Sequence, residues 1–336
     1  MMCKKIYLLI IVVIITILSA CSDTVDKINL KSKDNSRTGG ITHGVISPDP
    51  TETDFTLTYN GLPIELTYMF ENGKVDDVWG FCIYVEGLKQ PFSVNNDSQK
   101  HDMYIMNFSA NEYKELKVNF IPVVGKKDEI LEIVFVAMLN PNFVLDISEN
   151  NEVNQYGNNH VITQMPWRIK MNKSVQNALD GTVPLLGDLS DIPENFRKKF
   201  DIESPEQQPS NILDSSVVFE LFSNSPEEAS IENTTGNLEL TINAAGCYPE
   251  YGKPITYRLF LYVDHQLLNC FSDKSYADIK VSKDKLTTLK ISIDRKVLKN
   301  KNFIYLIAIP ISEEKNYEIM LPMQKTESKI LNVRNN

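Results

Sequence analysis

Side chains able to do chemistry are few in this sequence, and they stand apart from one another. The four histidines occur singly, as His43, His101, His160 and His265, with no His-x-His or His-Glu-x-x-His pattern. Zinc sites need several such ligands at close spacing, so the sequence predicts no metal site and no metal cofactor. Isolated histidines of this kind are expected on the surface or in loops.

Other catalytic patterns are also missing from the sequence. It contains no Gly-x-Ser-x-Gly nucleophile elbow and no glycine-rich phosphate loop before a helix. Acids are adjacent at Asp76-Asp77 and Glu227-Glu228, but adjacency does not place two carboxyl groups across a sugar, as glycoside hydrolysis requires. We therefore expect no catalytic residue, no cofactor and no enzyme activity.

Three cysteines lie beyond the N-terminal region, and this odd number excludes a complete disulfide framework. Cys82 lies in the apolar run Phe81-Cys82-Ile83-Tyr84-Val85, where we expect it to be a buried apolar residue. Cys247 and Cys270 form a candidate disulfide, which an exported protein could keep.

The N-terminus has the three parts of a secretory signal peptide: two lysines, an apolar run over residues 6–18, and small residues at a cleavage site. The run is shorter than the roughly 20 residues that span a bilayer. Leu18-Ser19-Ala20-Cys21 resembles the lipobox of bacterial lipoproteins. The resemblance implies that residues 1–20 are a signal peptide, and that fatty acyl chains such as palmitate on Cys21 anchor the protein on the extracytoplasmic face of the cell membrane.

The chain is acidic, with a formal net charge of -10 over 336 residues. Loss of the two leader lysines would make the charge about -12. A negative surface repels phosphate backbones, which argues against nucleic acid as a partner. It also repels anionic lipid, so the acyl chains would have to supply the attachment to the membrane.

The remaining chain divides by composition into four segments. Residues 21–53 are polar and interrupted by glycine and proline, which predicts a disordered tether. Residues 54–171 and 212–335 contain short β-type runs, and Asn60-Gly61 predicts a hairpin between the first two of them. Residues 172–211 are rich in proline and predict an interdomain segment with one short helix over Glu194 to Phe200.

The two strand-rich regions resemble each other in three segments. Phe81–Glu86 matches Leu259–Asp264, Leu116–Phe120 matches Leu289–Ile293, and Ile133–Ala137 matches Ile304–Ala308. The order is kept, which indicates an internal repeat. A unit of this length with about seven short strands is typical of a β-sandwich. We therefore expect an all-β chain with two tandem immunoglobulin-like β-sandwich domains, which is similar to the build of many bacterial surface lipoproteins.

Aromatic residues in expected loops are the candidate ligand-binding residues. Tyr248 and Tyr251 lie between two expected strands, and Trp79 ends the matching connection in the first unit. Exposed rings stack on sugars or anchor partner proteins, although such rings could instead cap the core.

The sequence therefore favours a non-enzymatic, membrane-anchored cell-surface lipoprotein that binds a protein partner or a glycan. The alternative is an accessory subunit of an envelope assembly for transport, secretion or a spore coat. An enzyme whose site forms only from distant segments is a third alternative.

Overall fold

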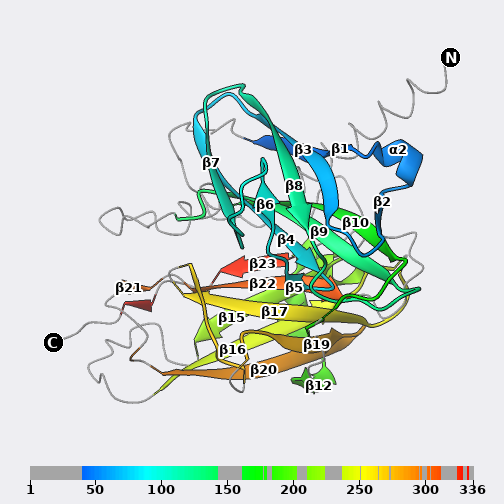
Figure 1. Ribbon diagram of the computed structural model, residues 1–336. Helices are drawn as coiled ribbons and strands as arrows, with labels where there is room; N and C mark the ends of the chain where they lie inside the picture. Colours follow the sequence, from blue (N-terminus) through cyan, green and yellow to red (C-terminus); the bar gives the residue numbers. More distant parts are fainter. Residues whose placement is uncertain are drawn as a thin grey trace. The chain divides into compact units, whose positions relative to one another are not determined.

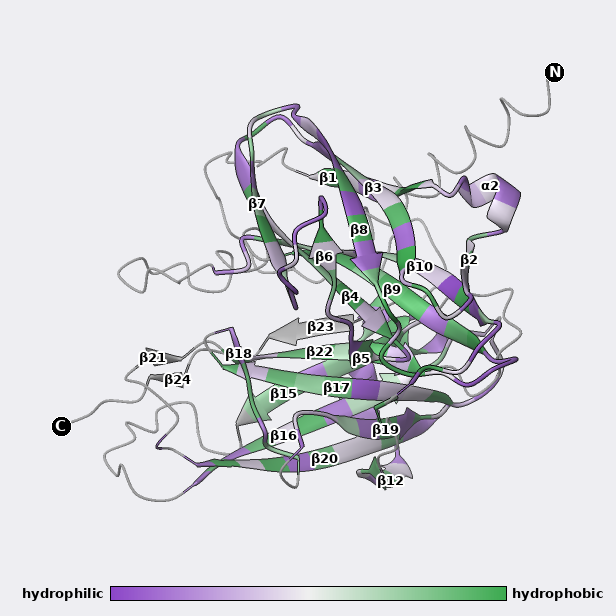
Figure 2. Cartoon of the chain, viewed as in Figure 1, coloured by the Kyte–Doolittle hydropathy of each residue, from purple (hydrophilic) through white to green (hydrophobic). Residues whose placement is uncertain are grey.

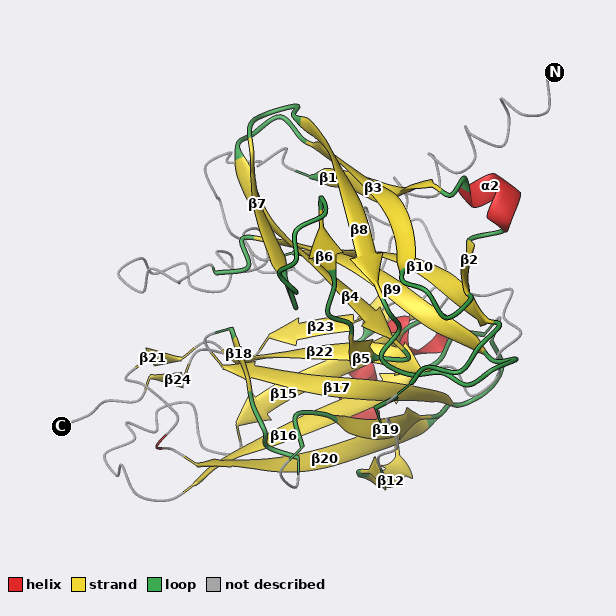
Figure 3. Cartoon of the chain, viewed as in Figure 1, coloured by secondary structure: helices red, strands yellow, loops and turns green. Residues whose placement is uncertain are grey.

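The computed structural model describes residues 40–142, 161–176, 178–179, 184–202, 210–223, 237–249, 251–263, 265–271, 274–294, 296, 301–302, 304–311, 324–327 and 331–332. The leader, Cys21 and His160 lie outside these residues. Strands dominate what is described, with only short helices between them (Figures 1 and 3). None of the described helices has the length and hydropathy needed to cross a membrane.

The first sandwich is built from strands between Ile41 and Met171. Its elements are β1 (Ile41–Ser47), α2 (Pro50–Thr53), β2 (Thr56–Tyr59), β3 (Ile64–Asn72), β4 (Asp77–Val85), β5 (Leu88–Lys89), β6 (Ser93–Val94), β7 (Tyr104–Phe108), β8 (Tyr113–Phe120), β9 (Ile130–Leu139) and β10 (Ile162–Met171). One sheet has the order β1-β3-β8-β6, and the other has the order β2-β10-β9-β4-β5 with β7 also paired to β4. These orders match the A-B-E-D and G-F-C sheets of an immunoglobulin-like sandwich.

The second sandwich repeats this arrangement. Its elements are β11 (Leu185–Leu186), β12 (Asp188–Asp191), α4 (Glu194–Lys198), β13 (Asp201–Ile202), β14 (Ser210–Asn211), η1 (Ile212–Asp214), β15 (Val217–Ser223), β16 (Asn237–Gly246), β17 (Ile255–Val263), β18 (Gln266–Leu267), β19 (Ala277–Val281), β20 (Lys285–Asp294), β21 (Lys301–Asn302), β22 (Ile304–Ile311), β23 (Gln324–Glu327) and β24 (Leu331–Asn332). The two main sheets have the orders β12-β20-β16-β15 and β11-β19-β17-β22-β23. The expectation of an all-β fold with two tandem sandwiches is confirmed.

The three segments matched in the sequence occupy equivalent strands of the two sandwiches. They form β4 and β17, β8 and β20, and β9 and β22. In each sandwich the first and third of these strands pair antiparallel in the centre of one sheet, and the second lies in the opposite sheet. The internal similarity is therefore also a similarity of topology.

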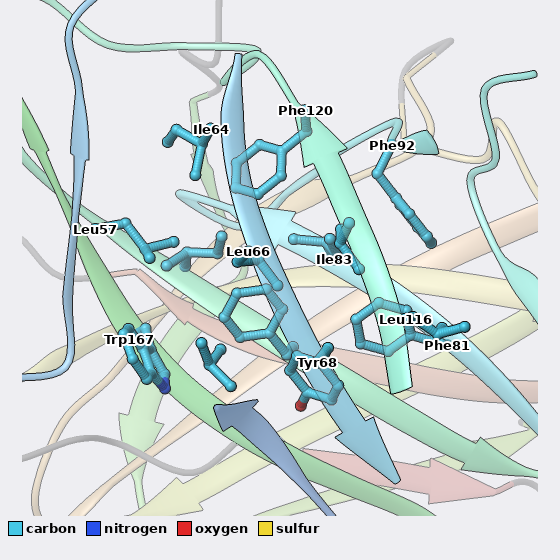
Figure 4. Packing of buried hydrophobic residues seen from close by; sticks show 14 of the residues in the cluster. Leu57, Ile64, Leu66, Tyr68, Phe81, Ile83, Phe92, Leu116, Phe120 and Trp167 are labelled. Carbon is cyan, nitrogen blue, oxygen red and sulfur yellow. The ribbon is translucent and has the colours of Figure 1, made fainter. Parts of the chain in front are cut away.

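Each sandwich encloses its own apolar core. In β8 the buried side chains are Leu116, Val118 and Phe120, which alternate with outward residues as the sequence predicts (Figure 2). The first core is rich in aromatic rings, including Tyr68, Phe81 and Trp167 (Figure 4). The second core is mainly aliphatic. Burial of each large side chain contributes about 1.5–3 kcal/mol to folding, so these cores account for much of the stability.

The central strands of the β4 and β17 sheets are buried on both faces. Residues of β4, β9, β17 and β22 that point away from their own sandwich cores form a third apolar cluster, drawn from both sandwiches. All of these strands lie within one compact part of the chain, which begins at Thr38. Their mostly apolar sequences follow from this, because both faces of such a strand are buried; Arg258 of β17 and Glu132 of β9 are charged exceptions.

The predicted hairpin at Asn60-Gly61 is wrong. The strands on either side of it, β2 and β3, lie in opposite sheets. β2 pairs in parallel with β10, and β3 pairs with β1 and β8. Gly61 does adopt a positive φ of 90°, but the turn carries the chain from one sheet to the other.

The tether predicted over residues 21–53 is wrong for its last part. β1 pairs with β3 along six residue pairs and buries His43 and Val45. These side chains alternate with outward residues, as expected for a half-buried edge strand. The first sandwich therefore begins before residue 54.

The interdomain segment predicted over residues 172–211 is also wrong in part. It contains β11 and β12, which extend the two sheets of the second sandwich through pairing with β19 and β20. The predicted helix is confirmed as α4, which buries Phe196 in a small cluster with Leu213 and Leu286. The segment is thus largely a part of the second sandwich.

Candidate functional site

No group of three or more potential metal ligands occurs among the described residues. The paired acids at 76–77 have structural roles. Asp76 accepts a hydrogen bond from the backbone of Ala110, and Asp77 lies buried in β4. Glu227 and Glu228 lie outside the described residues.

The three described cysteines are free thiols, so the candidate disulfide between Cys247 and Cys270 is not formed. Cys247 follows β16 and lies near the start of β17, whereas Cys270 follows the turn at the end of β17. Burial raises the pKa of Cys82 to about 11 and that of Cys270 to about 12. Thiols that stay protonated are poor nucleophiles.

His43 is buried, which corrects the expectation of a surface histidine. Its Nδ1 lies 2.6 Å from the Tyr68 hydroxyl, and its Nε2 lies 2.8 Å from Thr163 Oγ1. Its ring also stacks on Phe70, with centroids 6.1 Å apart. Burial lowers the pKa of His43 to about 4, so the ring is neutral at pH 7. His43 links β1 to strands of both sheets and is part of the framework.

A second group of ionisable side chains lies where the two sandwiches meet. Arg258 of β17 donates two hydrogen bonds of 2.8 Å to Asp278, and its Nη1 lies 3.2 Å from the backbone oxygen of Glu86 in the first sandwich. Its guanidinium also covers the Tyr276 ring at 4.6 Å. Nearby, burial and the charge of Glu86 raise the pKa of Glu132 to about 8. Arg258 and Asp278 are buried and held by each other, whereas Glu86 and Glu132 are half-buried.

Trp79 cannot contact a ligand, contrary to the prediction from its place in the sequence. It lies in β4 with its ring in the first core, only 2% exposed, and Nε1 donates a 3.2 Å hydrogen bond to Asn72 Oδ1. The strand begins two residues before Trp79, and the alternation along it directs the ring inward.

Tyr248 and Tyr251 lie in the loop between β16 and β17, as the sequence predicts. Both rings are half-buried and pack against the second core. The backbone of Tyr251 donates to the Tyr248 oxygen at 3.0 Å, which makes the loop a tight turn. Their role in binding stays a prediction, and their packing is also the one expected of rings that cap a core.

Three exposed aliphatic side chains gather at one end of the first sandwich. Leu62 is 74% exposed, Leu179 is 56% exposed and Ile121 is 48% exposed. We call these three residues the loop-end patch. Sequence reasoning missed them because each is a single apolar residue in a different connection.

Strand register and backbone bonds bring the three residues of the patch together. Ile64 pairs with Phe120; Leu62 lies two residues before Ile64 and Ile121 directly follows Phe120, so both lie at the same end of the β3–β8 pair. The backbone nitrogen of Leu179 donates to the Val123 oxygen at 2.8 Å. Asn172 Nδ2 also donates to Asn60 Oδ1 at 2.7 Å, which ties the third connection to the first.

The loops under the patch are held by side-chain hydrogen bonds. Gln90 is buried, and its Nε2 donates to the Ile121 oxygen at 2.9 Å while its Oε1 accepts from the Val123 nitrogen at 2.9 Å. A loop held in this way presents its apolar side chains without a further cost of ordering. The loop-end patch is therefore a set of exposed apolar side chains on loops that are held in place, and a contiguous apolar surface is the kind that marks sites of association.

Comparison with known proteins adds little to this picture. No protein-family model matches the sequence, and a search of curated proteins found no relative. Among solved structures, the CARDB domain of the PF1109 protein from Pyrococcus furiosus, in complex with di-metal ions, is 15% identical, covers 40% of this chain and 96% of its own, and has a TM-score of 0.24. The fold assignment therefore rests on the strand pairing described above.

Two further solved structures are similar at the same level. A protein of unknown function from Porphyromonas gingivalis W83 is 10% identical, covers 87% of this chain and 99% of its own, and has a TM-score of 0.22. WR4, an MSP family member from C. elegans, is 13% identical, covers 41% of this chain and 98% of its own, and has a TM-score of 0.20. None of these likenesses bears on a ligand or an activity of this chain.

Proposed function

We propose that the chain is an exported lipoprotein, anchored on the extracytoplasmic face of the membrane through Cys21, that performs no catalysis and binds a protein partner through the loop-end patch. The single observation that carries the binding role is the exposure of three aliphatic side chains on loops that are held in place. The lipobox-like sequence at residues 18–21 supports the proposed location on the membrane.

The chemistry of the patch favours a protein over a glycan. Sugars are recognised by stacking on aromatic rings, and the three patch residues are aliphatic. Three exposed lysines, Lys126, Lys127 and Lys173, lie in the same connections. A partner segment with apolar residues flanked by acidic ones would complement both features.

Site-specific photocrosslinking of the full chain in its own cells tests the binding role. A photoreactive residue replaces Leu62 in one strain and Leu189, which is 57% exposed in the second sandwich, in the control strain. We expect one discrete adduct from position 62 and none from position 189. The adduct should disappear when Ile121→Ser is added. Equal adducts from both positions, or an adduct that survives Ile121→Ser, would contradict the proposal.

The proposed membrane-anchored location has its own test, which does not depend on the partner. Intact-mass analysis of the membrane fraction should find a chain that begins at residue 21 and carries acyl chains. The Cys21→Ala variant should keep its leader and gain no lipid. An unmodified Cys21 thiol with the leader still attached would refute the anchored location and would leave the binding experiment valid.

A further inference from the structure

The third apolar cluster joins equivalent residues of the two sandwiches. In the first sandwich Tyr84 pairs with Val134, and in the second Tyr262 pairs with Tyr305. Two residues further along each strand, on the same face, Cys82 pairs with Val136 and Phe260 pairs with Ile307. The strand register is therefore the same in both sandwiches, and each residue of the cluster has a counterpart in the other sandwich.

Two counterparts in this cluster, Tyr84 and Tyr262, lie close to each other. Both are buried in the same cluster, and burial together with the neighbouring Tyr262 phenol raises the pKa of Tyr84. The Tyr84 ring also lies 5.8 Å from the Phe260 ring, measured between centroids. In an interface between two copies related by a two-fold axis, a residue meets its own counterpart only near the axis. Tyr84 and Tyr262 mark that position here.

The turns beside the interface keep the same correspondence. Gly87 follows β4 with a φ of 67°, and its counterpart His265 follows β17 with a φ of 65°. Short strands, β5 and β18, come next and pair back onto β4 and β17. The relation therefore extends beyond the apolar residues to the backbone of the turns.

The counterparts differ in size at the positions that face the other sandwich. Cys82 in the first sandwich corresponds to Phe260 in the second, and Val134 corresponds to Tyr305. The Tyr305 ring stacks on Tyr262 at 4.9 Å, which extends the large surface of the second sandwich. At these two positions the large side chains come from the second sandwich and the small ones from the first.

The edge of the interface shows the same difference in size. Arg258 reaches the backbone of Glu86, and a Cβ atom on Gly87 would lie 3.3 Å from the Arg258 side chain. The counterpart of Arg258 in the first sandwich is Gly80, which has no side chain to place there.

We infer that the two sandwiches meet in a pseudo-two-fold interface centred on Tyr84 and Tyr262, and that unequal side chains at equivalent positions make each sandwich fit the other and not a second copy of itself. Two second sandwiches would bring two Phe260 and two Tyr305 rings into one layer. Two first sandwiches would leave cavities beside Cys82 and Val134. Overpacking and cavities both destabilise an interface.

A double-mutant cycle on the full chain tests this inference. Cys82→Phe should overpack the layer near Tyr305, and Tyr305→Val should leave a cavity. Each variant should raise the unfolding equilibrium constant at least about tenfold. In the double variant C82F/Y305V the unfolding equilibrium constant should be lower, by about tenfold or more, than the two single effects multiplied together. The reason is that this variant copies the combination of Phe260 and Val134 on the other side of the axis.

The control cycle combines Tyr305→Val with Ala137→Phe. Ala137 lies on β9 but points into the first core, so the two effects should multiply without recovery. If Cys82→Phe yields no folded chain, Cys82→Leu replaces it, with the same sign of coupling expected. The inference would be overturned if the effects of Cys82→Phe and Tyr305→Val on the unfolding equilibrium constant simply multiplied. It would also be overturned if the control cycle showed an equal recovery of stability.

Discussion

The first sandwich has two apolar surfaces outside its core, and they differ in what covers them. The outward residues of β4 and β9 are Cys82, Tyr84, Val134, Val136 and Met138, and none is more than 3% exposed. We call them the covered face. The loop-end patch is equally apolar but open. The covered face therefore has its partner within the chain, whereas we propose that the loop-end patch binds a partner outside it.

A charge on the covered face should have the largest effect. Val136→Asp would bury a carboxylate among apolar side chains of both sandwiches. We expect a loss of more than about 3 kcal/mol in the free energy of unfolding. Urea unfolding of the full chain measures the loss. The matched variant Leu62→Asp in the loop-end patch should change stability by less than about 0.5 kcal/mol. Equal losses would erase the distinction between the two surfaces.

Removal of the cation at the edge of the covered face should have a similar effect. Arg258→Met would leave Asp278 buried without its two hydrogen bonds, at a cost of about 3–5 kcal/mol. The double variant Arg258→Met with Asp278→Leu should recover most of the loss, because the carboxylate is then also gone. Thermal unfolding distinguishes the variants. A double variant no more stable than Arg258→Met would show that the pair is not what stabilises this edge.

Acid should weaken the attachment of β1 by a smaller amount. The pKa of His43 is about 4 in the folded chain and near its ordinary value of 6.5 in the unfolded chain. The unfolded chain therefore takes up the proton first, and stability falls as the pH decreases from 6.5 to 4, by roughly 2–3 kcal/mol in total.

The free energy of unfolding at pH 7.5 and pH 4.5 measures this change. The variant His43→Gln, which cannot titrate, should lose that part of the pH dependence. A pH dependence that is the same in both proteins would assign the acid sensitivity to other groups.

The smallest effect on stability is expected in the loop-end patch itself. Leu62→Ser and Ile121→Ser remove exposed side chains, so each should change the free energy of unfolding by less than about 0.5 kcal/mol. Differential scanning calorimetry provides that measurement. Loss of a large amount of stability in either variant would mean that the patch is part of the core and not an open surface.

The sequence predicts most strands of this fold because their patterns are local. The alternation in Leu116–Phe120 and the apolar run Phe81–Val85 each identify a strand. The run also indicates burial on both faces, but it does not identify what covers the outer face. β1 was missed because only two of its seven residues are buried, and one of them is the polar His43.

Functional residues were harder to predict because they depend on tertiary contacts. Trp79 follows two acids and a turn-like stretch, which resembles a loop until the register of β4 directs its ring inward. Leu62, Ile121 and Leu179 lie far apart in the chain, and only the pairing of β3 with β8 and the bond from Leu179 to Val123 bring them together. No pattern within a single segment contains that information.

Hydrogen exchange of the full chain, with and without Val136→Asp, tests the central claim most directly. If the covered face joins the two sandwiches, the substitution in β9 should speed amide exchange in β17 and β22 as well as in β4, while Leu62→Asp should leave all three unchanged. Faster exchange confined to the first sandwich would contradict the claim that the two apolar faces hold each other.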